Sequence, residues 1–396
     1  MNKQLKKNLN LIYLFGFMYR FHLIGGVLVP FFTVWGGMTF TQMMIVQTWF
    51  LVWSFLLEIP TGAVADHIGR KHSMYLGALI WGIGALAYTS HPSMAMFLFA
   101  EFLLGLATAL YSGANEAYLF DILKQYKKEN LIGKVLGRYH SIELLGMVVA
   151  APLGSFIGAK IGLEWPFRLM IIPMLIAFVV GNLMDEPKRG KESESQRYLD
   201  IVKKGLKLFA KKRKIQWISI DLAVVMTISY IMIWLYQPLL LSLGFKLEWL
   251  GFVHSASTAA QIFILSFYNR IQKKISSEKL LAATALIPAI LFIVASKTYI
   301  IPLSIFAIIF SFGIGFTRKP LVAEELNSMI PSAQRATILS AVMIITKLFR
   351  SIVGPVVGKL ADWSVQGTLS IFGWLLVGYF VVRQIFLHSY YKKKQA

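Results

Sequence analysis

The chain has 396 residues, of which 57% are hydrophobic and only 15% charged, and its formal net charge is +21. Soluble domains contain about 45–50% apolar and about 25% charged residues, so this composition excludes a soluble enzyme, a disordered chain, a secreted disulfide scaffold and a coiled coil. The absence of cysteine excludes disulfides and thiolate metal sites.

Apolar windows of about 20 residues recur along the chain and predict a polytopic membrane protein. Six helices are expected in each half, on either side of a hydrophilic stretch. The first half predicts helices near 9–34, 40–65, 72–90, 94–122, 132–160 and 164–184, and the second half near 215–243, 247–268, 278–296, 298–323, 334–361 and 366–389.

Basic residues gather in the loops on one side of the predicted membrane, which places both termini in the cytoplasm. The central stretch alone carries eleven cationic residues between Lys188 and Lys214. These loops account for the net charge through topology and contact with anionic lipid. A role in binding nucleic acid is not expected, because the basic residues are scattered and lack an interleaved aromatic surface.

Three segments follow from this pattern: a six-helix bundle over 1–184, a linker over 185–214 and a second six-helix bundle over 215–396. The linker begins polar and becomes amphipathic around Ile201–Phe209. It therefore predicts a cytoplasmic helix on the inner membrane surface.

The two halves match each other at a constant shift of 203 residues. Residues of like kind then coincide in order: Asp66 with Asn269, Arg70 and Lys71 with Lys273 and Lys274, Asp121 with Glu324, and Pro152 with Pro355. A duplicated six-helix unit with one orientation is typical of transporters whose substrate path runs between the repeats.

The segment Gly62-Ala-Val-Ala-Asp66-His67-Ile-Gly69-Arg70-Lys71 resembles the signature loop of the major facilitator superfamily. The preceding Glu58-Ile-Pro60-Thr61 extends the resemblance to a bacterial branch rich in drug/proton antiporters. This resemblance implies an all-α fold of twelve transmembrane helices in two pseudo-symmetric bundles. It also implies alternating access, with small-molecule substrate and protons as partners, no cofactor, no enzymatic activity, a monomeric state and a place in the cell membrane.

The signature loop is expected to act as a gate. Gly62 is expected to allow close approach of helices, and Gly69 a tight turn. Asp66 is expected to contact a helix N-terminus, and Arg70 to pair with Asp121. Such contacts between halves would close one face. The alternative is that Arg70 and Lys71 only set the orientation of the chain.

The sequence departs from the family pattern at three points. His67 stands where Arg is common, Glu101 stands where many proton-coupled members have Arg, and Gly146–Gly154 is a degenerate form of the antiporter motif. Export is therefore favoured by the resemblance, and import or lipid flipping by the same fold is the alternative.

Ionisable side chains within the predicted helices are candidates for function, because they are costly in lipid. Glu143 is the leading proton carrier, with a static ion pair to Arg20 or Lys347 as the alternative. Glu116 follows, with a structural role as its alternative. Glu101 is placed nearer the outer surface, where a contact at the rim is equally expected.

Arg318 and Lys319 are expected to be gate residues at the inner face or snorkelling cations. Candidate substrate-binding residues are Arg20, Asn115, Tyr230, Trp234 and Gln237. The last three share one helix face and suit an aromatic wall with one amide, or else an interfacial aromatic belt.

Overall fold

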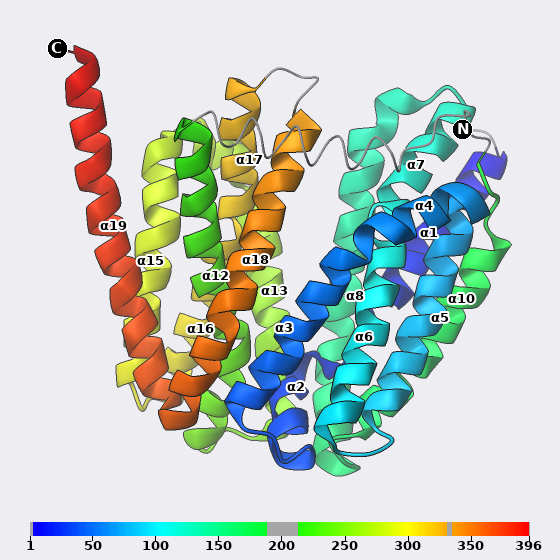
Figure 1. Ribbon diagram of the computed structural model, residues 1–396, viewed down its shortest axis with the longest axis horizontal. Helices are drawn as coiled ribbons and strands as arrows, with labels where there is room; N and C mark the ends of the chain where they lie inside the picture. Colours follow the sequence, from blue (N-terminus) through cyan, green and yellow to red (C-terminus); the bar gives the residue numbers. More distant parts are fainter. Residues whose placement is uncertain (1–2, 188–212, 331–334, 396) are drawn as a thin grey trace. The chain divides into compact units, whose positions relative to one another are not determined.

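The computed structural model describes residues 3–187, 213–330 and 335–395. Every regular element in these ranges is helical (Figure 1). The described residues fall into two compact units, the first made of 3–187 and 247–255, and the second of 213–246, 256–330 and 335–395. The predicted amphipathic linker helix lies outside the described residues.

The first unit is a bundle whose long helices run alongside one another (Figure 1). Its elements are α1 (Lys3–Tyr19), η1 (Leu23–Gly26), α2 (Leu28–Pro30), η2 (Phe31–Trp35), α3 (Phe40–Leu56), α4 (Glu58–Ile68), α5 (Arg70–Tyr88), α6 (Met94–Tyr111), α7 (Ala114–Gln125), η3 (Glu129–Leu131), α8 (Ile132–Lys160), α9 (Trp165–Leu169) and α10 (Ile171–Leu183).

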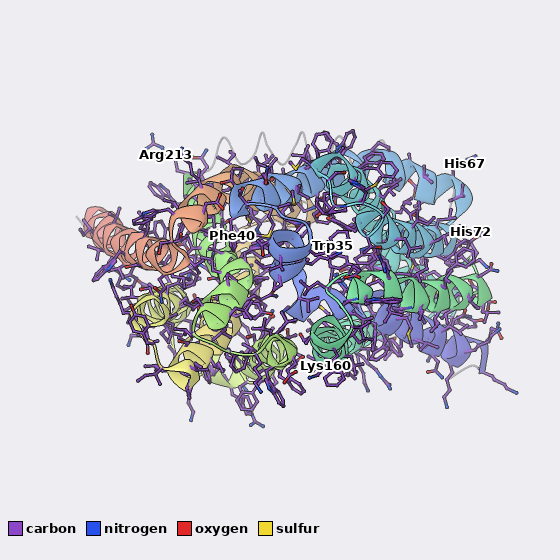
Figure 2. All side chains as sticks on the ribbon, turned by 90° about the horizontal axis from the view of Figure 1, so that it is seen from below. Trp35, Phe40, His67, His72, Lys160 and Arg213 are labelled. Carbon is purple, nitrogen blue, oxygen red and sulfur yellow. The ribbon has the colours of Figure 1, made fainter. Side chains whose placement is uncertain are left out.

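The second unit contains a similar series of helices. They are α12 (Arg213–Ser242), most of α13 (Leu250–Ser266), α14 (Tyr268–Gln272), α15 (Ser277–Lys297), α16 (Ile301–Phe316), α17 (Arg318–Met329), α18 (Arg335–Trp363) and α19 (Val365–Gln395). The short η4 (Leu247–Trp249) and the start of α13 pack with the first unit, where Glu248 lies 3.1 Å from Lys160. Lys160 marks the end of α8 in Figure 2.

Eight helices in the described residues are long and apolar enough to cross a membrane, and two bent pairs meet the same test together. The bent pairs are 3–35 and 40–68, which coincide with the first two predicted spans. The predicted spans near 72–90 and 247–268 are α5 and α13, which are helical but do not meet that test. The all-helical fold is therefore confirmed.

The ends of these helices follow from local sequence. Thr39 and Gln42 form a reciprocal capping box that starts α3. Phe40, the first residue of this helix, is labelled in Figure 2. Gly69, at φ +117°, allows the sharp turn between α4 and α5. His67 and His72 mark the two sides of this turn in Figure 2.

The helices contact one another through small side chains and turn large apolar ones outward. Ala78, Ala85 and Ala107, on α5 and α6, are fully buried, which allows close backbone approach. Phe156 and Val179 are exposed large apolar residues on α8 and α10. Apolar residues on the outside and small residues at helix contacts are the arrangement that lipid favours over water.

The predicted repeat reappears in the helices themselves. α8 and α18 are each 29 residues long, contain one proline each, and begin 203 residues apart. α7 and α17 are each 12 residues long and begin 204 residues apart. The shift found in the sequence therefore relates equivalent structural elements.

Candidate transport site

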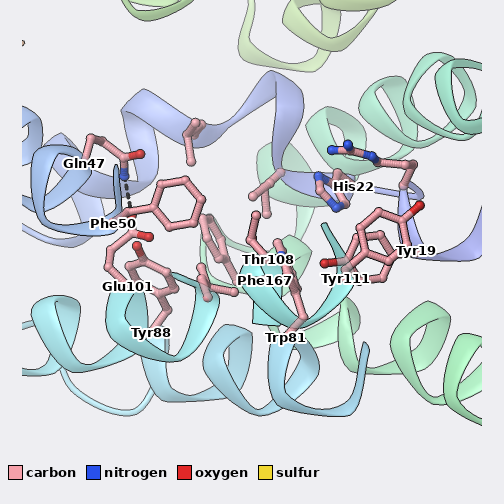
Figure 3. A pocket seen from close by; sticks show the side chains of 14 residues that line it. Tyr19, His22, Gln47, Phe50, Trp81, Tyr88, Glu101, Thr108, Tyr111 and Phe167 are labelled. Carbon is pink, nitrogen blue, oxygen red and sulfur yellow. Dashed lines mark hydrogen bonds between the residues drawn. The ribbon is translucent and has the colours of Figure 1, made fainter. Parts of the chain in front are cut away.

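A cavity of about 210 Å³ lies within the first unit (Figure 3). Six of its fourteen lining residues are Phe, Tyr or Trp, including Phe50, Trp81 and Phe167. Polar side chains lie at its two ends. Ligand sites are commonly mostly apolar with a few placed polar groups, so this cavity has the composition of a binding site.

Glu101 occupies one end of the cavity. Glu101 is only 3% exposed, and its carboxylate accepts a hydrogen bond from the Gln47 amide (Figure 3). The Tyr88 hydroxyl also hydrogen-bonds to it. No cation among the described residues lies within ion-pair distance of Glu101. The expected contact at an exposed rim is wrong, because the packing of α6 against α3 buries this side chain.

Arg20 and Tyr111 lie at the other end, and both contact Glu143. Arg20 Nε is 3.4 Å from Glu143 Oε1, and the Tyr111 hydroxyl donates to the same oxygen at 2.5 Å. Tyr111 stacks on Tyr19 at 3.9 Å between ring centroids and also hydrogen-bonds to Tyr139. The sequence predicted Arg20 as a substrate ligand, or as an ion-pair partner of Glu143. The structure shows the ion pair, and Arg20 also lines the cavity, where its role as a ligand stays a prediction.

His140 links Glu143 to Glu116. Its Nδ1 is 2.8 Å from Glu143 Oε2, and its Nε2 is 3.4 Å from Glu116 Oε1. The side chain of Glu143 is 8% exposed, that of His140 is 46% exposed and that of Glu116 is 58% exposed. Sequence reasoning missed His140, although its position three residues before Glu143 on one helix placed them on one face.

Asn115 does not line the cavity. It is buried, and its Oδ1 accepts from the Glu116 backbone N–H at 2.9 Å. The predicted helix over 94–122 is broken at Ser112 and Gly113, where Gly113 has φ +77°. Asn115 therefore stabilises the start of α7, and its expected role as a substrate ligand stays a prediction.

The signature loop forms contacts within the first unit. Arg70 Nε lies 2.8 Å from Asp121, which joins α5 to α7. Both residues belong to the same unit, so the expectation that this pair connects the two halves is wrong. Lys71 Nζ donates to the carbonyl oxygens of Asn182 and Met184 at the end of α10, a favourable position for a cation.

The structure also bears on the roles expected for Gly62 and Asp66 in this loop. A Cβ at Gly62 would meet nothing within 4 Å, so the predicted close approach of helices at Gly62 is wrong. The carboxylate that accepts from the N-terminus of α5 is Glu186, which takes the backbone N–H groups of Arg70 and Lys71 at 2.8 and 3.0 Å. Asp66 makes its own interactions nearby.

The carboxylate that matches Asp121 in the second unit has neutral partners. Glu324 accepts from the Gln272 amide at 2.5 Å and from the Tyr268 hydroxyl at 2.8 Å, both on α14. Asp121 thus has an ionic partner on α5, whereas Glu324 has hydrogen-bonding partners on α14.

The aromatic wall predicted on α12 is buried in the second unit. Trp234 and Gln237 are buried, and the Gln237 amide donates to the Tyr236 hydroxyl at 3.0 Å. Tyr230 lies beneath the Arg350 guanidinium, 3.8 Å from its ring centroid. These contacts show cohesion within the unit, and a substrate-binding role for these residues stays a prediction.

Arg318 is fully buried, so the expectation of a snorkelling cation is wrong for it, and a role as a gate residue at the inner face stays a prediction. Its guanidinium pairs with Asp221 and also donates to the Leu281 carbonyl oxygen and the Thr284 hydroxyl. Asp221 further accepts from the Tyr379 hydroxyl at 2.7 Å and lies 3.2 Å from Arg383 Nε. Lys319, in contrast, is exposed.

The chain has two units with membrane-length helices, and the first contains buried ionisable groups around a cavity. This arrangement is typical of membrane transport proteins. The family profile for the Major Facilitator Superfamily matches residues 9–355. The chain belongs to this superfamily and is a multi-pass membrane transporter.

Several known proteins are similar to this chain. An uncharacterized MFS-type transporter, YxaM of Bacillus subtilis, is 23% identical over 84% of this chain and 81% of its own. The galactose-proton symporter of Escherichia coli is 25% identical over 41% of this chain and 39% of its own. The solved structure of the nucleoside transporter NupG has a TM-score of 0.81 at 14% identity, covering 95% of this chain and 98% of its own.

These relatives bear on the expected branch of the family. A D-xylose transporter of Levilactobacillus brevis is 27% identical over 48% of this chain and 44% of its own. The named relatives are thus sugar transporters and an uncharacterized member, and the specific resemblance to drug/proton antiporters is not supported.

Proposed function

We propose that this transporter imports a small polar solute of the sugar or nucleoside type together with protons. The observation that carries the proposal is the cavity of the first unit, which has Glu101 at one end and two partners of Glu143 at the other. Both carboxylates are buried within helices long enough to cross a membrane, where ionisable groups are costly and often take part in proton transfer. Each therefore supports a role in binding a proton where a solute binds.

The cavity suits a hydroxyl-rich solute. Gln47, Glu101, Arg20 and Tyr111 offer hydrogen-bond donors and acceptors at the ends, and aromatic rings between them can pack on the C–H faces of a sugar or nucleoside. Its volume of about 210 Å³ is below the range of roughly 300–1,000 Å³ typical of sites for drug-sized ligands. A small solute is favoured over a large amphipathic drug.

Coupling follows from the Arg20–Glu143 pair. When Glu143 takes a proton, it loses the charge that attracts Arg20, which then has donors free for solute hydroxyl groups. When Glu143 releases the proton, the pair re-forms and competes with the solute. A ligand shifts a conformational equilibrium only by its differential affinity for the two states, and this exchange provides such a difference.

Export of an amphipathic molecule by the same fold is the second candidate, because Phe50, Trp81 and Phe167 make most of the cavity wall apolar. Efflux would need the same proton-binding carboxylates but the opposite direction of solute movement. The direction of solute movement therefore separates the two candidates.

The test uses right-side-out and everted membrane vesicles with an imposed pH gradient. The panel contains D-galactose, D-xylose, L-arabinose, uridine and a fluorescent cationic amphiphile. We expect one of the sugars or uridine to accumulate in right-side-out vesicles when the outside is acidic. Accumulation of the amphiphile alone, in everted vesicles, would support efflux and contradict import.

Amide variants test the carboxylates in the same assay. Glu143→Gln is expected to lower gradient-driven accumulation on the order of tenfold or more, while solute exchange without a gradient continues. Glu101→Gln is expected to weaken solute binding as well, because it lies directly on the cavity. Glu164→Gln, at a carboxylate that precedes α9, pairs with Arg168 and does not line the cavity, is the matched control.

A further inference from the structure

We propose that His140 is a proton relay that connects the buried carboxylate of Glu143 to the exposed carboxylate of Glu116. This inference rests on the proposed proton coupling and adds the route by which the coupled proton reaches water. It assigns a function to a histidine that neither the sequence pattern nor the family resemblance singled out.

The first support is the placement of both ring nitrogens. Nδ1 lies 2.8 Å from Glu143, and Nε2 lies 3.4 Å from Glu116. A neutral imidazole is a donor at one nitrogen and an acceptor at the other. His140 can therefore accept from one carboxyl group while it donates to the other, which a histidine with one carboxylate partner cannot do.

The second support is the gradient of exposure along the three residues. Glu143 is buried, His140 is half-exposed and Glu116 is the most exposed of the three. The buried end touches Tyr111 and Arg20, which line the cavity. The chain of contacts thus runs from the cavity wall toward the surface of the first unit.

The third support is the position of the relay along the helices. His140 is eight residues after the start of α8, about 12 Å along the helix at 1.5 Å per residue. The segment before α8 carries Lys124, Lys127 and Lys128, which favours the cytoplasmic side. The relay therefore lies in the cytoplasmic half of the bundle and suits release of an imported proton.

The proton balance is simple. Protonated Glu143 donates to Nδ1 while the Nε2–H donates to the Glu116 carboxylate. Glu143 becomes negative, Glu116 becomes neutral and the ring stays neutral as the other tautomer. Glu116 then loses its proton to water. The half-exposed His140 ring takes a proton from water at Nε2 and releases one to water from Nδ1, which restores the first tautomer.

Other charged and titratable groups face the relay and influence it. Arg20, which directly follows α1, and Tyr111 on α6 contact Glu143. Tyr139 on α8 lies beside the His140 ring, with centroids 5.6 Å apart. Protonation of Glu143 therefore competes with its ion pair to Arg20. His140 provides the path by which protons pass between Glu143 and water.

The test needs no transported solute. Time-resolved infrared spectroscopy of the full chain in detergent, after a rapid drop in pH, follows the carbonyl stretch of the protonated carboxyl group that Glu143→Gln abolishes. We expect His140→Gln to slow the appearance of this band at least about tenfold, and added imidazole to restore the rate in His140→Ala. His91→Gln, at an exposed histidine in the loop before α6, is the matched control.

The outcomes separate the relay from the transport proposal. An unchanged rate in His140→Gln would overturn the relay, as would a wild-type protein in which no Glu143 band appears at any pH. A loss of rate that imidazole does not restore would assign His140 a structural role instead. If the relay behaves as expected but no solute of the panel moves with protons, the relay stands and the proposed function fails.

Discussion

Glu101 and Glu143 are both buried carboxylates of the first unit, yet their neighbours differ. Glu101 faces neutral hydrogen-bonding groups, whereas Glu143 faces a guanidinium, a phenol and an imidazole. The sequence correctly indicated both as costly groups within helices. It could not rank their surroundings, because most of the partners, namely Arg20, Gln47, Tyr88 and Tyr111, lie far away along the chain.

At the residue scale, the clearest stability prediction concerns Asp221. It faces two guanidinium groups and a tyrosine hydroxyl in a buried cluster. Removing one partner of a buried ion pair typically costs about 3–5 kcal/mol, since the remaining charge stays buried. We expect Asp221→Asn to lower the free energy of unfolding by this amount in a denaturant titration in mild detergent.

Glu164→Gln provides the comparison for Asp221→Asn, because its pair with Arg168 is more exposed. Exposed pairs contribute about 0–1 kcal/mol. Equal effects of the two substitutions would contradict a dominant role for the buried cluster.

At the element scale, helix breaks decide where functional groups lie. The break at Gly113 separates α6 from α7 and places Glu116 beside His140 rather than on the cavity wall. A hydropathy pattern shows one long apolar segment here, because glycine and serine hardly change its average. The positive φ of Gly113 is a backbone property that the pattern does not report.

The end of α10 is connected to α1 by Asp185. Its carboxylate accepts from the side-chain amides of Asn8 and Gln4 at 2.7 and 2.5 Å, and these hydrogen bonds, that of Asn8 first, lower the pKa of Asp185. A lowered pKa stabilises the folded state at pH values above the ordinary pKa of about 3.9, and this stabilisation is lost as the pH falls through the lowered value.

We therefore expect a pH-dependent difference between wild type and Asp185→Asn. The wild type should be the more stable protein above about pH 4, and the difference should close as the pH falls further. Acid unfolding followed by tryptophan fluorescence in detergent measures it. Glu129→Gln, at an exposed carboxylate, is the control, and a constant difference for Asp185→Asn down to the lowest pH would refute the assignment.

At the scale of the whole molecule, the two units repeat helices but not chemistry. α8 and α18 keep the same length and proline, while Arg70–Asp121 in one unit corresponds to hydrogen bonds from Gln272 and Tyr268 to Glu324 in the other. Ionic contacts weaken with salt more than neutral ones do. The contact of Asp121 in α7 is therefore expected to depend more on ionic strength than the contacts of Glu324 in α17.

The orientation of the molecule can be tested directly, because the chain contains no cysteine. The basic loops predict that Lys128 lies on the cytoplasmic side and His91 on the opposite side. We expect Lys128→Cys to react with a membrane-impermeant maleimide in everted vesicles but not in intact cells, and His91→Cys to show the reverse. Labelling of both positions from one side would contradict the proposed topology.

The sequence by itself determined the class of fold, the family and the repeat, because membrane helices must be long, apolar and internally hydrogen-bonded. Composition and spacing report these requirements directly. Only the tertiary structure decided that Arg20, Tyr111, His140 and Glu116 gather around Glu143, and that Arg318 is buried beside Asp221. Such contacts depend on which faces of distant helices meet, and helix periodicity alone does not specify that.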